Sequence, residues 1–138
     1  MTSIGEYVFD ECSGLTSVTI PNSVMSIGMG VFYNCSSLSS IKVESGNTKY
    51  DSRDNCNAII ETISNTLIAG CKNTTIPNSV TGIGENAFRN CLSLASVTIP
   101  NSVTSIGEYT FMDCFSLTLV NIPNSVTSIG RFAFANCI

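Results

Sequence analysis

The stretch Ile99-Pro100-Asn101-Ser102-Val103-Thr104-Ser105-Ile106-Gly107 decides the fold of this chain, because nearly the same nine residues begin again at Ile20, Ile76 and Ile122. The spacing is 23 residues from Ile76 to Ile99, and 23 again from Ile99 to Ile122. A fixed period of about 20–50 residues is the signature of a repeat architecture, in which each unit packs on its neighbours. The sequence therefore predicts a solenoid.

Each repeat carries a short alternating segment before the Ile-Pro pair. Leu94, Val97 and Ile99 are apolar, whereas Ser96 and Thr98 are polar. This alternation is typical of a half-buried β-strand. The Pro-Asn-Ser that follows supplies turn chemistry, so we expect the chain to reverse there and to return as a second short strand.

A glycine ends that second segment, and a phenylalanine and a cysteine three residues apart follow it in five copies. The pairs are Phe9 and Cys12, Phe32 and Cys35, Phe88 and Cys91, Phe111 and Cys114, and Phe134 and Cys137. A spacing of three places both side chains on one face of a single helical or 3₁₀ turn. The predicted unit is strand, turn, second strand and short helical turn, in a single array of about six repeats over residues 1–138.

The composite pattern Leu-x-x-Val-x-Ile-Pro-x-x-Val-x-x-Ile-Gly-x-x-x-Phe-x-x-Cys resembles the BspA-like leucine-rich repeat over essentially the whole chain. The resemblance implies a parallel-sheet solenoid from a cell-surface protein of bacteria or some protozoa. It also implies adhesion, with an extracellular protein or glycan as partner, and the family has no shared catalytic residues. The implied location is the cell surface or the secreted space, as part of a longer parent protein.

Residues 38–70 form an irregular, longer repeat. The distance from Ile20 to Ile76 is 56 residues, which is one period of 23 plus a long period of 33. Segments 58–61 and 66–69 flank a short polar turn, which predicts a β-hairpin in place of the helical turn. Counting back from Ile76 puts Cys71 at the usual leucine position and Asn65 at the usual phenylalanine position.

The long repeat also holds seven of the sixteen charged residues of the chain. The candidate loop within it comprises Lys49, Tyr50, Asp51, Arg53 and Asp54. Binding residues often sit on insertions held by rigid elements, so this loop could confer specificity. The alternative, which the sequence favours, is a solvated loop that covers a thinner part of the core.

The outward residues of the first strands are predicted to stack into two columns on one face. One column is Ser17, Ser40, Asn73, Ser96 and Leu119, and the other is Thr19, Lys42, Thr75, Thr98 and Asn121. We expect ligand binding on this face at Lys42, Asn73, Thr75, Ser96, Thr98, Leu119 and Asn121. The alternative is a structural spacer with no ligand of its own, for which serine and threonine merely suit solvent-facing strands.

The seven cysteines leave three readings open. Equivalent positions of neighbouring strands stack about 4.8 Å apart, which is within reach of a disulfide, but reduced cysteine also packs as a small apolar residue. A metal site is less favoured, because the usual zinc spacing and histidine are both missing. Cys56 and Cys71, outside the repeat pattern, could bond to each other or remain thiols.

Composition argues against several function classes. The net charge is −4, with no histidine and no basic cluster, so neither nucleic acid nor a membrane surface is an expected partner. No apolar run is long enough to insert into a bilayer. The sequence has no histidine, its acidic residues are scattered over outward positions, and its serines and threonines follow the repeat, so we expect neither enzymatic activity nor a cofactor. The chain lacks polar caps at both ends, which predicts a piece of a longer array that could self-associate end to end.

Overall fold

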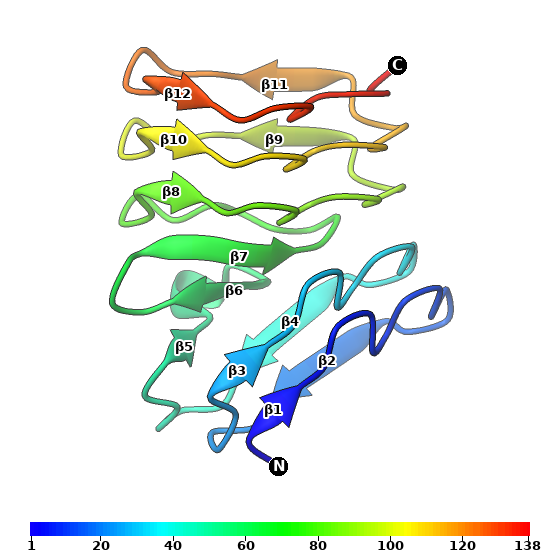
Figure 1. Ribbon diagram of the computed structural model, residues 1–138, viewed down its shortest axis with the longest axis vertical. Coiled ribbons are helices and arrows are strands. Elements are labelled where there is room, and N and C mark those ends of the chain that lie inside the picture. The colour runs from blue at the N-terminus through cyan, green and yellow to red at the C-terminus, as the bar shows by residue number, and fades with distance from the viewer.

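The chain winds into a solenoid in the computed structural model, which describes all 138 residues (Figure 1). The strands are β1 (Ser3–Ile4), β2 (Ser17–Ile20), β3 (Ser26–Ile27), β4 (Ser40–Val43), β5 (Tyr50–Asp51), β6 (Ala58–Glu61), β7 (Thr66–Gly70), β8 (Gly82–Ile83), β9 (Ser96–Thr98), β10 (Ser105–Ile106), β11 (Leu119–Asn121) and β12 (Ser128–Ile129), and the one helix is the 3₁₀ helix η1 (Arg53–Asn55). We call one turn of the winding a rung. A regular rung contains a first strand, a second strand and a turn segment, which is the stretch from the glycine to the cysteine, as in residues 28–35, so the predicted solenoid is confirmed. The second strands of the first to sixth rungs are β1, β3, β7, β8, β10 and β12, and the third rung is the long one.

The second strands stack in parallel, one repeat apart. Ile4 of β1 lies beside Ile27 of β3, and Ile106 of β10 lies between Ile83 of β8 and Ile129 of β12. A β-branched side chain suits this half-buried position. Ile106 is buried because a rung covers it on both sides, whereas Ile129 in the last rung is exposed.

The first strands form two separate two-stranded sheets. β2 pairs with β4, and β9 pairs with β11, both in parallel. Residues 71–76 contain no strand: the Thr74 amide donates to the Cys71 carbonyl in a turn, and the Thr75 amide donates to the Cys56 carbonyl. Because Thr75 bonds to the segment before β6 and not to β4, the first-strand face is interrupted. The prediction of two unbroken columns is wrong at this point.

The hairpin predicted in the long rung is confirmed. β6 and β7 are antiparallel, with a β-bulge between Ile59 and Ile60. β7 continues the second-strand column beside β8, and the resulting six-stranded sheet has the order β12-β10-β8-β7-β6-β5. Figure 1 shows that the strands β1 to β4 are inclined to the strands above the hairpin, so the winding changes direction at the long rung.

Gly70, and not Asn65, occupies the phenylalanine position of the long rung. The Gly70 amide donates to the Ala87 carbonyl at 2.9 Å, as the Phe88 amide donates to the Thr110 carbonyl at 2.9 Å in the next rung. Asn65 lies in the hairpin turn with a φ of 52°. The residue count was wrong because six residues lead from Gly70 to Ile76, whereas eleven lead from Phe88 to Ile99 in the next rung, so the long rung is shortened after β7.

The turn segments hold phenylalanine and cysteine on one turn, but their backbone is a series of turns that never becomes a helix. In the first rung the Cys12 amide donates to the Phe9 carbonyl at 3.1 Å, while Tyr7 and Glu11 have φ values of 55° and 59°. Left-handed residues at two positions prevent a right-handed helix from propagating. The same two positions are left-handed in the other rungs, at Gly30 and Asn34, Asn86 and Asn90, Tyr109 and Asp113, and Phe132 and Asn136. No helix is long and apolar enough to cross a membrane.

The hairpin also divides the core in two. A cluster of 18 buried residues fills the rungs above it, and a cluster of 11 fills the rungs below. Ile60 belongs to the first cluster and Ile59 to the second, because successive strand side chains point to opposite faces. The upper cluster contains the stack of Phe88, Phe111 and Phe134, whose neighbouring ring centroids lie 5.2 Å apart. In the lower cluster the centroids of Phe9 and Phe32 are 6.1 Å apart.

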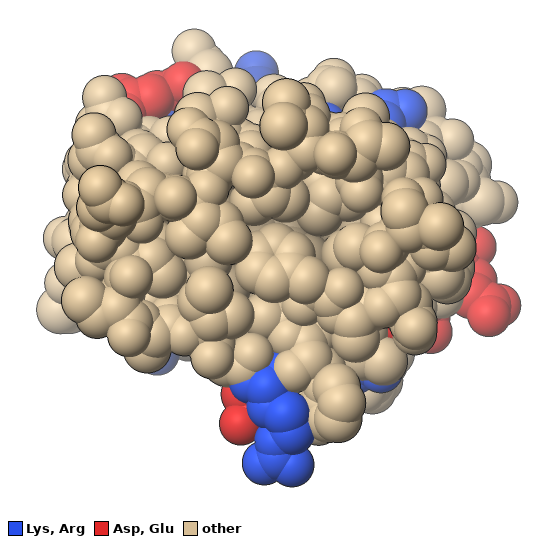
Figure 2. All heavy atoms as spheres, turned by 90° about the horizontal axis from the view of Figure 1, so that it is seen from above, with Lys and Arg blue, Asp and Glu red and all other residues tan.

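The last rung presents a nearly uncharged surface. Figure 2 looks onto this end of the stack and shows lysine, arginine, aspartate and glutamate only around its rim. The exposed apolar side chains of this rung include Ile122, Ile129 and Phe132. Their counterparts in the rung before are covered, so the exposure follows from position in the stack.

Candidate binding surfaces

The pair of first strands β9 and β11 directs polar side chains to solvent, as expected. Ser96 lies beside Leu119 and Thr98 beside Asn121, and all four are exposed. Val97 between them is buried, which fixes their outward direction because strand side chains alternate. We call these four residues the upper face. Leu119, with 65% of its surface exposed, is its one apolar member.

Lys42 lies on a separate face. In the β2–β4 pair, Ser17 lies beside Ser40 and Thr19 beside Lys42. Lys42 is exposed and belongs to neither ion pair of the structure. Since the two sheets are not joined, the structure does not bring Lys42 together with the upper face.

Asn73 and Thr75 are exposed but lie outside any strand. Thr75 nevertheless borders the upper face, because it lines a shallow groove of about 370 Å³ together with Ser96 and Thr98. The other lining residues are Thr74, Ile76, Asn78, Val97 and Pro100. We call this the polar groove. Its hydroxyl and amide groups can both donate and accept hydrogen bonds, and Asn73 is not among them.

The residues of the candidate loop, Lys49 to Asp54, contact one another and the hairpin. Tyr50 is buried, and the Lys49 ammonium lies 6.0 Å from the centre of its ring. Arg53 Nη2 lies 2.6 Å from Asp51 Oδ2, and Arg53 Nη1 donates to Asn65 in the hairpin turn at 2.7 Å. Burial would raise the pKa of Asp51, but hydrogen bonds from Arg53 and Thr62 prevail and lower it. Of the five residues only Asp54 is fully exposed.

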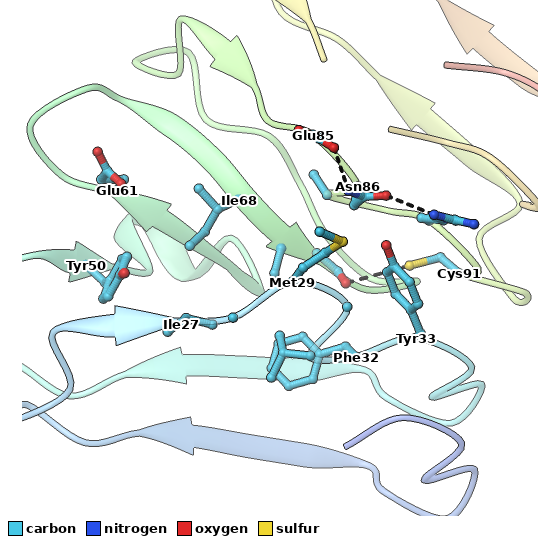
Figure 3. A pocket seen from close by; sticks show the side chains of 17 residues that line it. Ile27, Met29, Phe32, Tyr33, Tyr50, Glu61, Ile68, Glu85, Asn86 and Cys91 are labelled. Atoms are coloured by element: carbon cyan, nitrogen blue, oxygen red, sulfur yellow. Dashed lines mark hydrogen bonds between the residues drawn. The ribbon is translucent and has the colours of Figure 1, made fainter. Parts of the chain in front are cut away.

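A cleft that the sequence did not predict lies between the second and fourth rungs (Figure 3). Its walls are the turn segments that contain Met29 and Asn86, its floor is the second half of β7 from Ile68 to Gly70, and its volume is about 260 Å³. Glu61 and Glu85 lie at its border. We call it the inter-rung cleft. The cleft exists because β7 runs straight, whereas the turn segments of the rungs on both sides bulge outward. The only feature of the sequence that could have indicated the cleft is the missing Gly-x-x-x-Phe-x-x-Cys segment.

The one arginine of this cleft makes cation–π contacts with the rings of two tyrosines. The Arg89 guanidinium carbon lies 5.5 Å from the ring centre of Tyr33 and 5.3 Å from that of Tyr109. Burial raises the pKa of Tyr33 to about 12, although the Arg89 charge opposes the shift. The Tyr33 hydroxyl and Arg89 Nε are both buried at this contact, where the guanidinium is the polar group that faces the hydroxyl.

The cysteines of the turn segments are free thiols, and all of them except Cys12 in the first rung donate to the rung before. Cys114 Sγ lies 3.0 Å from the Phe88 carbonyl oxygen, and Cys35 Sγ lies 2.9 Å from that of Phe9. Burial raises the pKa of Cys114 to about 12 and that of Cys35 to about 11. Cys56 and Cys71 are buried, free thiols as well. No group of three or more histidine, cysteine, aspartate or glutamate side chains could hold a metal ion.

Comparison with known sequences and structures identifies this architecture. The family described as BspA type Leucine rich repeat region matches residues 1–69 and 53–138, in six copies. A leucine rich cell surface protein from Faecalibacterium prausnitzii is 34% identical with a TM-score of 0.76, and the match covers 100% of this chain and 37% of that protein. No curated protein matches the sequence.

Two further solved structures are similar. A leucine-rich repeat protein from Eubacterium ventriosum is 30% identical with a TM-score of 0.78, and the match covers 99% of this chain and 37% of that one. A leucine-rich repeat protein from Bacteroides ovatus is 34% identical with a TM-score of 0.61, covering 100% of this chain and 33% of that one. The chain thus spans about a third of the length of these proteins. Since the family match extends over residues 1–138, the chain belongs to the BspA type leucine-rich repeat family.

Proposed function

We propose that this chain is a protein- or glycan-binding module of an adhesin-like cell-surface protein, and that it binds through the upper face and the polar groove. The observation that carries the proposal is the position of Thr75, Ser96 and Thr98, which line one groove beside the exposed Leu119 and Asn121. Solenoids of stacked repeats commonly bind on extended sheet surfaces. The cell-surface location is supported by the Faecalibacterium prausnitzii relative, which is described as a cell surface protein.

The chemistry of the groove fits a polar, uncharged ligand surface. None of its lining residues carries a charge, so binding there would depend on hydrogen bonds from hydroxyl and amide groups, with apolar contact from the half-buried Pro100 and from the exposed Leu119 beside the groove. Such a lining suits sugar hydroxyls or peptide amides, which present donors and acceptors together. Lys42 is left out of the site, because it lies on the separate β2–β4 sheet.

A spacer role is the second candidate, and the regularity of the stack favours it. Backbone hydrogen bonds join the second strands and turn segments of neighbouring rungs at equivalent positions, as from Gly107 to Ile83 and from Gly130 to Ile106, both at 2.8 Å. Only 12% of residues are charged. A module of this kind could hold another domain away from a surface without contacting a ligand.

The two functions are separated by a binding panel with matched variants. The purified chain is tested against immobilised matrix glycoproteins and a glycan array, beside the double variant Ser96→Lys/Thr98→Lys. The control is Ser17→Lys/Thr19→Lys, which places the same changes on the exposed residues of β2. We expect saturable binding that the first variant loses and the control keeps. Equal loss in both variants, or no binding by the folded protein, contradicts the proposal and favours the spacer.

A further inference from the structure

Strand β9 is an edge strand on the side of the polar groove. It pairs with β11 alone, in a two-stranded sheet. On its other side, residues 71–76 contain no strand, and the Thr75 amide donates to the Cys56 carbonyl at 3.0 Å instead of pairing with β9. The groove, of about 370 Å³, therefore runs along a strand that lacks a neighbour on this side.

The backbone groups that face the groove follow from the alternation along β9. The Ala95 carbonyl accepts from the Thr118 amide of the next rung at 3.0 Å, so the backbone of Val97, two residues further, faces β11 as well. The N–H and C=O groups of Ser96 and Thr98 face the opposite way, toward the groove. They make no hydrogen bond outside the β9–β11 pair. This edge of β9 thus presents donors and acceptors in alternation.

The opposite wall of the groove leaves this edge open. The Thr74 hydroxyl donates to the Asn57 carbonyl at 2.6 Å, and the Thr75 amide is taken by Cys56, so both groups bond away from β9. No backbone hydrogen bond joins residues 74–78 to residues 96–100. An unpaired strand edge is a template for another extended chain, whose own edge carries donors and acceptors in the same alternation.

The groove accepts only a small side chain at its centre. Val97 and Ile76 are 5% and 6% exposed, so the core side of the groove is closed. In an added strand, the residue beside Val97 would direct its side chain to that closed side, and its two neighbours would direct theirs to solvent beside Ser96 and Thr98. The lining carries no charge. These features fit an uncharged segment with glycine, alanine or serine between two β-branched residues.

We propose that the partner of this chain is a protein that presents such an extended segment, and that the segment adds to the groove edge of β9 as a further strand. The inference rests on the proposed function, since it uses the same groove, and it names protein and not glycan as the partner. Sugar hydroxyls do not present donors and acceptors in the fixed alternation of a strand edge. β9 has three residues, so the paired part of the segment spans about 10 Å.

Hydrogen exchange of individual amides provides the first test. In the free protein we expect the Ser96 and Thr98 amides to exchange at least roughly tenfold faster than the Val97 amide between them, since only the latter faces β11. Equal protection of the three amides would show that the groove edge of β9 is already paired, which would overturn the proposal.

A display library of random heptapeptides provides the second test. We expect it to yield peptides with a small residue between threonine or valine residues, and these peptides should slow exchange at Ser96 and Thr98. They should bind at least roughly tenfold more weakly to Thr98→Pro, which lacks the groove-facing N–H, and normally to Thr98→Val, which lacks only the hydroxyl. Thr19→Pro is the control, at the equivalent position of β2 outside the groove. A library without such peptides, or equal binding to Thr98→Pro and the parent protein, overturns the proposal.

Methylation of the peptide tests the pairing without altering the protein. Each backbone nitrogen of a selected heptapeptide is methylated in turn. Because alternate amides of an added strand face β9, methylation at every second residue of the paired part should abolish binding, and methylation between them should be tolerated. Loss of binding without this alternation overturns the proposal.

The closing experiment separates this inference from the proposed function. A matrix glycoprotein that the chain binds is tested again after enzymatic removal of its glycans, and in competition with a selected heptapeptide. We expect binding that survives removal of the glycans and is displaced by the peptide. Binding that disappears with the glycans, and that Ser96→Lys/Thr98→Lys also lacks, overturns the peptide partner but keeps the proposed function. Binding that Ser96→Lys/Thr98→Lys retains overturns both.

Discussion

The ring of Phe88 lies directly over the α-carbon of Gly70. A Cβ atom built on Gly70 would overlap the ring atoms of Phe88 and no other group comes as near. Phe88 is fully buried and is stacked on Phe111 with an angle of 10° between the rings. Gly70 therefore stands where a regular rung has phenylalanine, and its missing side chain makes room for the phenylalanine of the next rung.

Replacing Gly70 by alanine should therefore destabilise the fold. The new methyl group must displace the Phe88 ring, which is held by Phe111 on its other side, and overpacking of this kind costs about 1–3 kcal/mol. The free energy of unfolding in urea measures the loss. Gly14→Ala is the control, because a Cβ on Gly14 meets nothing within 4 Å. Equal stability of the two variants would contradict the account of Gly70.

Phe111 should contribute more to stability than any exposed aromatic residue. Its ring is fully buried between those of Phe88 and Phe134, and truncation of a buried phenylalanine to alanine costs about 3–5 kcal/mol. Phe115 is 50% exposed, so Phe115→Ala should cost far less. Urea denaturation of both variants tests the order, and a small loss for Phe111→Ala would place the core elsewhere.

The fold could be predicted from the sequence because the apolar positions repeat at a fixed period. Ile83 and Ile106, one repeat apart, do lie side by side in parallel strands. The phenylalanine position of the long rung could not be found by counting back from Ile76, because residues 71–76 lack the first strand of a regular rung and cover the return with six residues in place of eleven. Counting therefore placed the phenylalanine position at Asn65, whereas in the structure Gly70 occupies it.

The candidate sites could be predicted only where the strands are regular. The outward directions of Ser96 and Thr98 follow from alternation with Val97, and the structure shows them. The inter-rung cleft arises where the straight strand β7 stands in place of a turn segment, and no side-chain pattern within residues 38–70 marks such a cleft. The sequence signal was an absence, the lack of a turn segment in residues 38–70.

The stability of the protein should fall as the pH rises from about 9 toward 12. Burial raises the pKa of Cys114 from 9.0 to about 12, and it raises that of Cys91 well above 9.0. At a pH between the pKa of Cys114 in the unfolded state and its pKa in the folded state, the folded state keeps a proton that the unfolded state has lost. A rise in pH over this range therefore favours unfolding. Each such thiol steepens the decline by up to about 1.4 kcal/mol per pH unit. Below pH 9 the thiols are protonated in both the folded and the unfolded state, so their full contribution to the free energy of unfolding remains.

Urea titrations at several pH values between 8 and 11, in the presence of a reducing agent, measure this decline. The variant Cys114→Ala removes the titrating group, so its unfolding free energy should start lower but fall less steeply with pH than that of the parent protein. Leu117→Ala serves as the control, because Leu117 is buried in the same cluster as Cys114 but carries no titratable group, so its truncation should lower the stability and leave the slope unchanged. If Cys114→Ala keeps the parental slope, the buried thiol does not remain protonated in the folded state, and its hydrogen bond to the Phe88 carbonyl cannot hold through this range. A slope that changes only with Cys114→Ala would instead show that the thiols between the rungs stabilise the stack in their protonated form.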